Sequence, residues 1–71
     1  MGVVEDLADE LAKDALKAAD EHNDDMIIAR VSEILGADSI TTQEAFLTAI
    51  RVRKADRRAR LYLTNLQKPQ S

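Results

Sequence analysis

Apolar residues recur at steps of three and four along three stretches of the chain, the spacing of helices with one apolar face. These stretches cover about residues 3–21, 24–35 and 41–67. No stretch alternates apolar and polar residues over the length of a strand. The pattern therefore predicts an all-α chain of three helices with a short second and a long third helix. It predicts one helical domain over residues 1–68 and a polar tail at residues 69–71.

The apolar positions of the first two segments define the faces that we expect to be buried. The first face is expected to comprise Val4, Leu7, Ala8, Leu11, Ala15, Ala18 and Ala19. The second is expected to comprise Ile27, Ile28, Val31, Ile34 and Leu35. Between the two segments, Asn23 can end the first helix in a left-handed conformation or cap the second. Gly36 suits the position just past the second helix, where a positive φ costs glycine nothing.

The third segment opens with Thr41-Thr-Gln-Glu44, the pattern of a capping box. In this interpretation Thr41 is the N-cap, Glu44 reaches back to it, and Ile40 closes over the first turn. Phe46 and Ile50 are expected to anchor the beginning of this helix in the core.

Beyond that anchor, the third segment carries two different stripes. One stripe follows alternating steps of four and three residues and is interrupted only at Asp56. It consists of Ala45, Ala49, Val52, Ala59, Leu63 and Leu66. The other stripe starts with Phe46 and Ile50 and turns basic at Arg53, Arg57 and Arg60.

The size of the chain limits the core that these faces can form. A domain of 71 residues buries only about 60% of the surface that its unfolded chain exposes. Small domains usually add disulfides, a structural metal or self-association. The chain has no cysteine and one histidine, which excludes disulfides and thiolate metal sites. Self-association is the remaining expectation.

Charge is distributed unevenly along the chain. Residues 1–25 carry nine acids and two lysines, a balance of −7, and residues 26–50 carry −2. Residues 51–71 carry seven bases against Asp56, a balance of +6. This asymmetry predicts either internal pairing of the two ends or a basic surface for a partner.

The predicted helix lengths favour a homodimer. At 1.5 Å per residue, the third helix spans roughly 38 Å and the second about 17 Å. In an up-down-up arrangement, the third helix would carry its apolar end beyond the core, where exposed apolar residues indicate a partner. Either the C-terminal halves of two copies pair, or each lies on the acidic first helix of the other.

The sequence offers little for catalysis. The single histidine, His22, lies in a predicted surface break, without a nucleophile beside it. The acids around it lack the glycine and the alternating ligands of a calcium loop. We therefore expect no enzyme activity, no metal, no cofactor and no small-molecule substrate. The acidic N-terminus and the lack of a long apolar run predict a cytoplasmic protein without a membrane segment.

Two functions are favoured by this pattern, and a purely structural subunit of a larger assembly is the third alternative. The first is a regulatory or bridging protein–protein interaction module that binds itself or another protein. Its contact residues would be Arg53, Arg57, Arg58, Arg60, Leu61, Tyr62 and Leu66. The second is a nucleic-acid-binding regulator resembling a helix-turn-helix, with Gly36 in the turn. Its contact residues would be Thr42, Gln43, Arg51, Arg53, Lys54, Arg57 and Arg58.

Overall fold

The protein is a chain of three helices without strands in the computed structural model, which describes residues 2–67. The helices are α1 (Val3–His22), α2 (Met26–Asp38) and α3 (Ile40–Gln67). The all-α prediction and the order of a short second helix and a long third helix are confirmed. The predicted tail at residues 69–71 lies outside the described residues.

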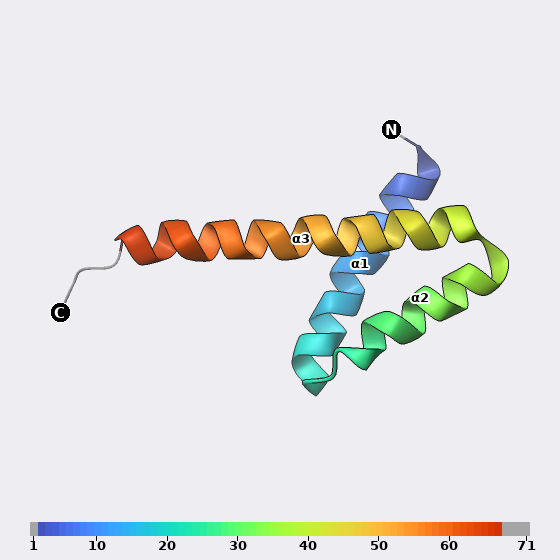
Figure 1. The fold of residues 1–71 in the computed structure, drawn as a ribbon, viewed down its shortest axis with the longest axis horizontal. Coiled ribbons are helices and arrows are strands. Elements are labelled where there is room, and N and C mark those ends of the chain that lie inside the picture. Colours follow the sequence, from blue (N-terminus) through green and yellow to red (C-terminus); the bar gives the residue numbers. More distant parts are fainter. Residues whose placement is uncertain (1, 68–71) are drawn as a thin grey trace.

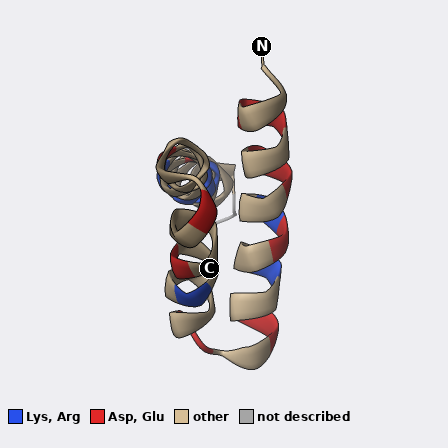
Figure 2. Cartoon of the chain, turned by 90° about the vertical axis from the view of Figure 1, so that its right-hand side faces the viewer, with Lys and Arg blue, Asp and Glu red and all other residues tan. Residues whose placement is uncertain are grey.

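The helices form two thin layers rather than an up-down-up bundle. Figure 1 shows that α3 crosses α1 steeply, while α2 runs back from the end of α1 to the start of α3. Viewed along α3, α1 lies on one side and α2 and α3 lie on the other (Figure 2). The Cα atoms extend over 52 × 30 × 13 Å. The expected up-down-up arrangement is therefore wrong, because a steep crossing lets α1 and α3 meet over only part of their lengths.

The turn between α1 and α2 depends on Asn23 and Asp24. Asn23 has a left-handed backbone (φ 50°, ψ 47°), and its N–H donates to the carbonyls of Ala19 and Asp20. This confirms the first of the two roles expected for Asn23. The Asp24 carboxylate then accepts a hydrogen bond from the Met26 N–H at 3.0 Å. Asp24 thus precedes α2, which begins two residues later than predicted.

A single residue, Ser39, joins α2 to α3. Its N–H donates to the Leu35 carbonyl at 2.8 Å, and its Oγ accepts from the Thr42 N–H at 3.1 Å. Ser39 therefore ends α2 and caps α3, and the predicted capping box at Thr41 and Glu44 is wrong by two residues. Ile40 is the first residue of α3 and is 60% exposed, so it does not close over the first turn.

Gly36 lies inside α2 and has no positive φ, which corrects its predicted place beyond the helix. A Cβ atom at Gly36 would lie 2.5 Å from Nε2 of Gln43. That Nε2 donates to the Ser32 carbonyl at 2.9 Å and to the Ser32 Oγ at 3.3 Å. Because Gly36 has no side chain, it leaves room for Gln43 of α3 to donate hydrogen bonds to the buried Ser32 of α2.

We expect Gly36→Ala to change stability little in the wild-type chain. Alanine gains about 0.8–1 kcal/mol of helix propensity, and displacement of Gln43 loses about 1 kcal/mol of hydrogen bonding. In a Gln43→Ala background only the gain remains, so the same substitution should stabilise by about 1 kcal/mol. Urea unfolding of the four variants measures this coupling. Equal effects of Gly36→Ala in both backgrounds would contradict it.

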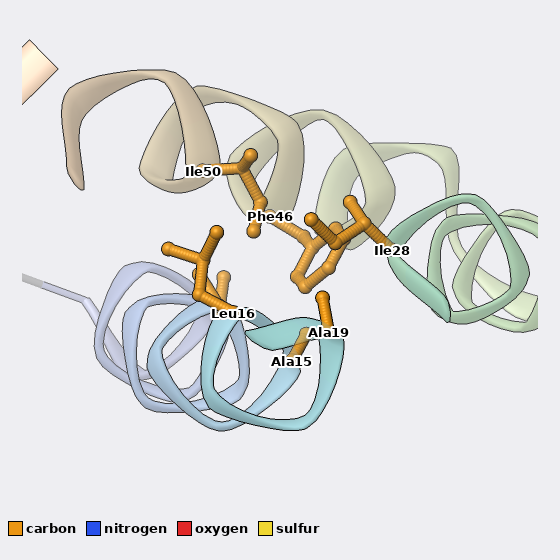
Figure 3. Packing of buried hydrophobic residues seen from close by; sticks show 8 residues of the cluster. Ala15, Leu16, Ala19, Ile28, Phe46 and Ile50 are labelled. Carbon is orange, nitrogen blue, oxygen red and sulfur yellow. The ribbon is translucent and has the colours of Figure 1, made fainter. Parts of the chain in front are cut away.

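The core lies where α3 crosses α1, with α2 closing one side. Phe46 is fully buried and Ile50 is 5% exposed. In Figure 3 both side chains point from α3 toward Leu16 and Ala19 of α1, with Ile28 of α2 beside them. The predicted anchor of α3 is thus confirmed. The buried core consists of Ala8, Ala12, Ala15, Leu16, Ala19, Ile28, Phe46 and Ile50.

The buried faces of α1 and α2 are rotated from the predicted ones. Leu7 and Ile34 were expected in the core but are 63% and 67% exposed. Ala12 and Leu16 are buried although they were not on the predicted face. Small alanine side chains dominate the face of α1, which allows α3 to approach its backbone closely.

Candidate functional site

The second half of α3 extends beyond the core. Every residue of α3 from Lys54 to Gln67 is exposed, and we call this segment the projecting half of α3. Figure 1 shows it passing α1 and continuing away from both other helices. Its large apolar residues and their exposed fractions are Leu61 (59%), Tyr62 (64%), Leu63 (55%) and Leu66 (65%). The predicted overshoot of the third helix is therefore present.

The projecting half is a continuous helix through Asp56. The Asp56 carboxylate accepts hydrogen bonds from Nε of Arg60, one turn later, at 3.0 and 3.2 Å. Such pairs four residues apart stabilise a helix modestly, and alanine, leucine and arginine are good helix formers. These local interactions favour the helical state of this segment.

Two arginines of α3 pair with α1. Arg53 donates from Nε and Nη2 to both carboxylate oxygens of Asp9, at 2.8 and 2.9 Å. Arg57 pairs with Asp20 at 3.0 Å. Arg53 and Arg57 follow the buried Phe46 and Ile50 by seven residues, so they continue the face of α3 that contacts α1. Internal pairing of the two ends, one of the predicted alternatives, is present at these two residues.

A second basic face of α3 is formed by Arg51, Lys54 and Arg58. Within residues 2–67, no carboxylate lies within ion-pair distance of Arg51, Lys54 or Arg58. Steps of three and four residues place these cations on one side of α3, and Tyr62 follows one turn after Arg58. The predicted basic patch is thus divided into a paired face toward α1 and an unpaired face.

Arg53 holds the pKa of Asp9 below its usual value, mainly through its hydrogen bonds to that carboxylate. Because the pKa of Asp9 is lower in the folded state, ionised Asp9 stabilises the fold above its unfolded pKa of about 4. That contribution is lost as the pH falls through the folded pKa.

We therefore expect Asp9→Asn to be less stable than the wild type at about pH 7, with a difference that vanishes at about pH 2. Denaturant unfolding at both pH values measures it. The matched control is Asp14→Asn, which removes another exposed acid of α1 that forms no ion pair among the described residues. An equal loss of stability in Asp14→Asn would contradict a specific role of the Asp9–Arg53 ion pair.

A groove of about 610 Å³ lies between the first turns of α1 and the first half of α3. One wall is acidic and the other is apolar. The lining residues are Glu5, Asp6 and Asp9 of α1 and Ala45, Thr48, Ala49 and Val52 of α3. The apolar wall belongs to the stripe that continues along the projecting half as Ala59, Leu63 and Leu66. The sequence did not predict this groove, because it depends on where α3 crosses α1.

Thr42 and Gln43, two of the residues predicted to contact nucleic acid, lie apart from the basic faces. Thr42 is half-buried, and its hydroxyl accepts a hydrogen bond from Ser39 Oγ at 2.9 Å. Gln43 is half-buried and bound to Ser32. The predicted resemblance to a helix-turn-helix is wrong, since Gly36 is helical and only Ser39 separates α2 from α3.

Other types of site are not apparent in the part of the chain that the structure describes. No group of three potential metal ligands lies close together among residues 2–67. In the same range, none of the helices combines the length and the apolar character needed to cross a membrane. The exposed residues of α3 and the groove beside α1 are therefore the candidate site.

Scans of protein-family models, curated proteins and solved structures each gave no match to this chain.

Proposed function

We propose that this protein is a small, non-catalytic protein–protein interaction module that self-associates through the projecting half of α3. The observation that supports it is the set of four large apolar side chains, each more than half exposed, on a helix that extends past its own core. Scattered apolar residues are normal on a protein surface, but a contiguous group indicates a partner. The proposal includes a cytoplasmic location, which fits a chain without cysteine.

The helical energetics of α3 support the same proposal. Fourteen residues from Lys54 to Gln67 are exposed, and isolated helices shorter than about 12–15 residues are marginal in water. Most helical stability in proteins comes from packing of an apolar face. A second helix would supply that packing and bury leucine side chains worth about 1.5–3 kcal/mol each when fully buried. Arginine and tyrosine, which flank these leucines, often dominate interfaces.

A nucleic-acid partner is the second candidate, and the unpaired cations Arg51, Lys54 and Arg58 favour it. Neutralisation of about three phosphates would give a shallow dependence of affinity on salt, with a slope of roughly −3 in logarithmic units. An anisotropy titration with duplex DNA at two salt concentrations tests this candidate. Absence of binding at about 50 mM salt would remove it, since phosphate contacts are strongest at low salt.

Sedimentation equilibrium tests self-association. We expect a dimer at about 100 µM, far above the micromolar dissociation constants of modest interfaces. Circular dichroism of the same sample reports the helical content. A monomer at this concentration with the full helical content of the three helices would contradict the proposal, because the projecting half would then be stable without a partner.

A further inference from the structure

The apolar stripe of α3 has the spacing of a coiled-coil seam. Alternating steps of four and three residues over three seven-residue repeats keep an apolar stripe facing one partner helix. We call this stripe the α3 seam. It comprises Ala45, Ala49, Val52, Asp56, Ala59, Leu63 and Leu66.

The two ends of the α3 seam differ in size and surroundings. Ala45 and Ala49 at one end are small, half-buried and line the groove beside α1. Leu63 and Leu66 at the other end are large and exposed. An antiparallel partner helix would place large residues against small ones at both ends, which fills space evenly.

We propose that two copies of this chain pair antiparallel along the α3 seam, so that the projecting half of each occupies the groove between α1 and α3 of the other. This inference rests on the self-association proposed above and specifies its geometry. One register pairs every residue of the α3 seam from Ala49 to Leu66. Leu66 faces the partner's Ala49, Leu63 faces the partner's Val52, and Ala59 faces the partner's Asp56. The two-fold axis then passes between Arg57 and Arg58.

Asp56 selects this geometry over parallel pairing. In a parallel, in-register pair, the two Asp56 carboxylates would face each other within the seam, where like charges are unfavourable. In the antiparallel register each Asp56 faces the small Ala59 of the partner and keeps its own Arg60. A single polar position in an apolar seam commonly fixes register and orientation at some cost in stability.

Charge complementarity identifies a second copy as the occupant of the groove. Arg60 follows Arg53 by seven residues, so both lie on the side of α3 that faces α1 in the first half of the helix. In the antiparallel pair, this side of the projecting half approaches the first turns of the partner's α1. Glu5 and Asp6 line the groove there and form no ion pair within residues 2–67. The partner's Arg60 would bring positive charge to this acidic wall while it stays paired with Asp56 of its own chain.

The groove is also open to a helix from this direction. In Figure 1, only the first turns of α1 lie above α3, whereas α2 and the rest of α1 lie below it. The groove residues place the α3 seam on the side of those first turns. A helix lying along the seam therefore contacts α3 beside it and the first turns of α1, and meets no other described element.

Disulfide trapping tests the register, because the chain contains no cysteine. Val52→Cys and Leu63→Cys variants are mixed and oxidised with oxidised glutathione. We expect the mixed disulfide between the two variants. Each variant alone should form little disulfide, since its two cysteines would lie 11 residues, about 16 Å, apart along the seam, beyond the Cα separation of about 7 Å that a disulfide spans.

The matched control is the mixture of Lys54→Cys and Leu61→Cys. These positions lie at equal heights in the same register but on the side of α3 away from the seam, so no disulfide is expected. Efficient trapping of the control pair, or of Leu63→Cys with itself, would overturn the antiparallel seam. A dimer in sedimentation that gives no trapped pair would also overturn it. A monomer would overturn both the seam and the self-association on which it rests.

A distance measurement keeps the inference testable if the Leu63→Cys substitution weakens the dimer. Spin labels on Glu44→Cys, an exposed position, leave the seam intact. Antiparallel pairing separates the two labelled sites by about 40 Å along the helix axes. A separation of about 10–20 Å, the distance between neighbouring helices plus the labels, would show parallel pairing and overturn the inference.

Discussion

Phe46→Ala is expected to remove a large part of the folding free energy of this protein. Phe46 is fully buried where all three helices meet, against Leu16 and Ala19 of α1 and Ile28 of α2 (Figure 3). Truncation of a buried phenylalanine to alanine costs about 3–5 kcal/mol. At about 0.05–0.15 kcal/mol per residue, a chain of this length has a total stability of only about 4–10 kcal/mol. Among residues 2–67, Phe46 is the one large side chain that is fully buried.

Urea unfolding followed by circular dichroism measures this loss, at one protein concentration because the proposed self-association would raise the apparent stability. The matched control is Ile34→Ala, a large-to-small apolar change at a position that is 67% exposed. We expect the control to change stability by no more than about 0.5 kcal/mol. Similar losses in the two variants would show that the core is not centred on Phe46.

The helices of the fold could be predicted from the sequence because their apolar periodicity depends on residues that are close together in the chain. The three helices, the left-handed Asn23 and the buried Phe46 and Ile50 each depend on neighbours a few residues away. Gly36 shows where local information is insufficient. Its signal for a helix end was overridden by a tertiary contact, since the missing side chain makes room for Gln43.

The buried face of α1 could not be predicted without knowing how α3 crosses α1. Leu7 and Leu16 are both apolar and both fit a helical stripe, yet only Leu16 lies where α3 and α2 meet α1. A bundle of aligned helices would have buried a stripe along the whole of α1. A steep crossing buries a patch, and the crossing direction is not encoded in the period of either helix.

The candidate site was predictable in part. The basic continuation of the Phe46 and Ile50 stripe was visible in the sequence, and Arg53 and Arg57 do face α1. Their partners on α1, Asp9 and Asp20, could not be chosen among the seven acids of that helix without knowing how α3 crosses it. The groove also depends on how α3 crosses α1, so only the structure showed the acidic wall opposite the α3 seam.

Leu63→Lys/Leu66→Lys is expected to convert the proposed dimer into a folded monomer. Both leucines are more than half exposed in the single chain, so their replacement leaves the Phe46 core unchanged. In the dimer they would account for four buried leucines, and loss of roughly 1.5 kcal/mol at each raises the dissociation constant at least about a thousandfold. Sedimentation equilibrium reports the dissociation.

Hydrogen exchange adds a readout that localises the effect. Amides of the projecting half should exchange faster in this double variant, because the helix would lose the packing of the proposed dimer, while amides around Phe46 and Leu16 keep their protection. The matched control is Leu61→Lys, which introduces the same charge at a leucine that is 59% exposed but off the seam. We expect it to remain a dimer. Dissociation of the control to the same extent would mean that the contact extends around the projecting half, and that the seam does not define the interface.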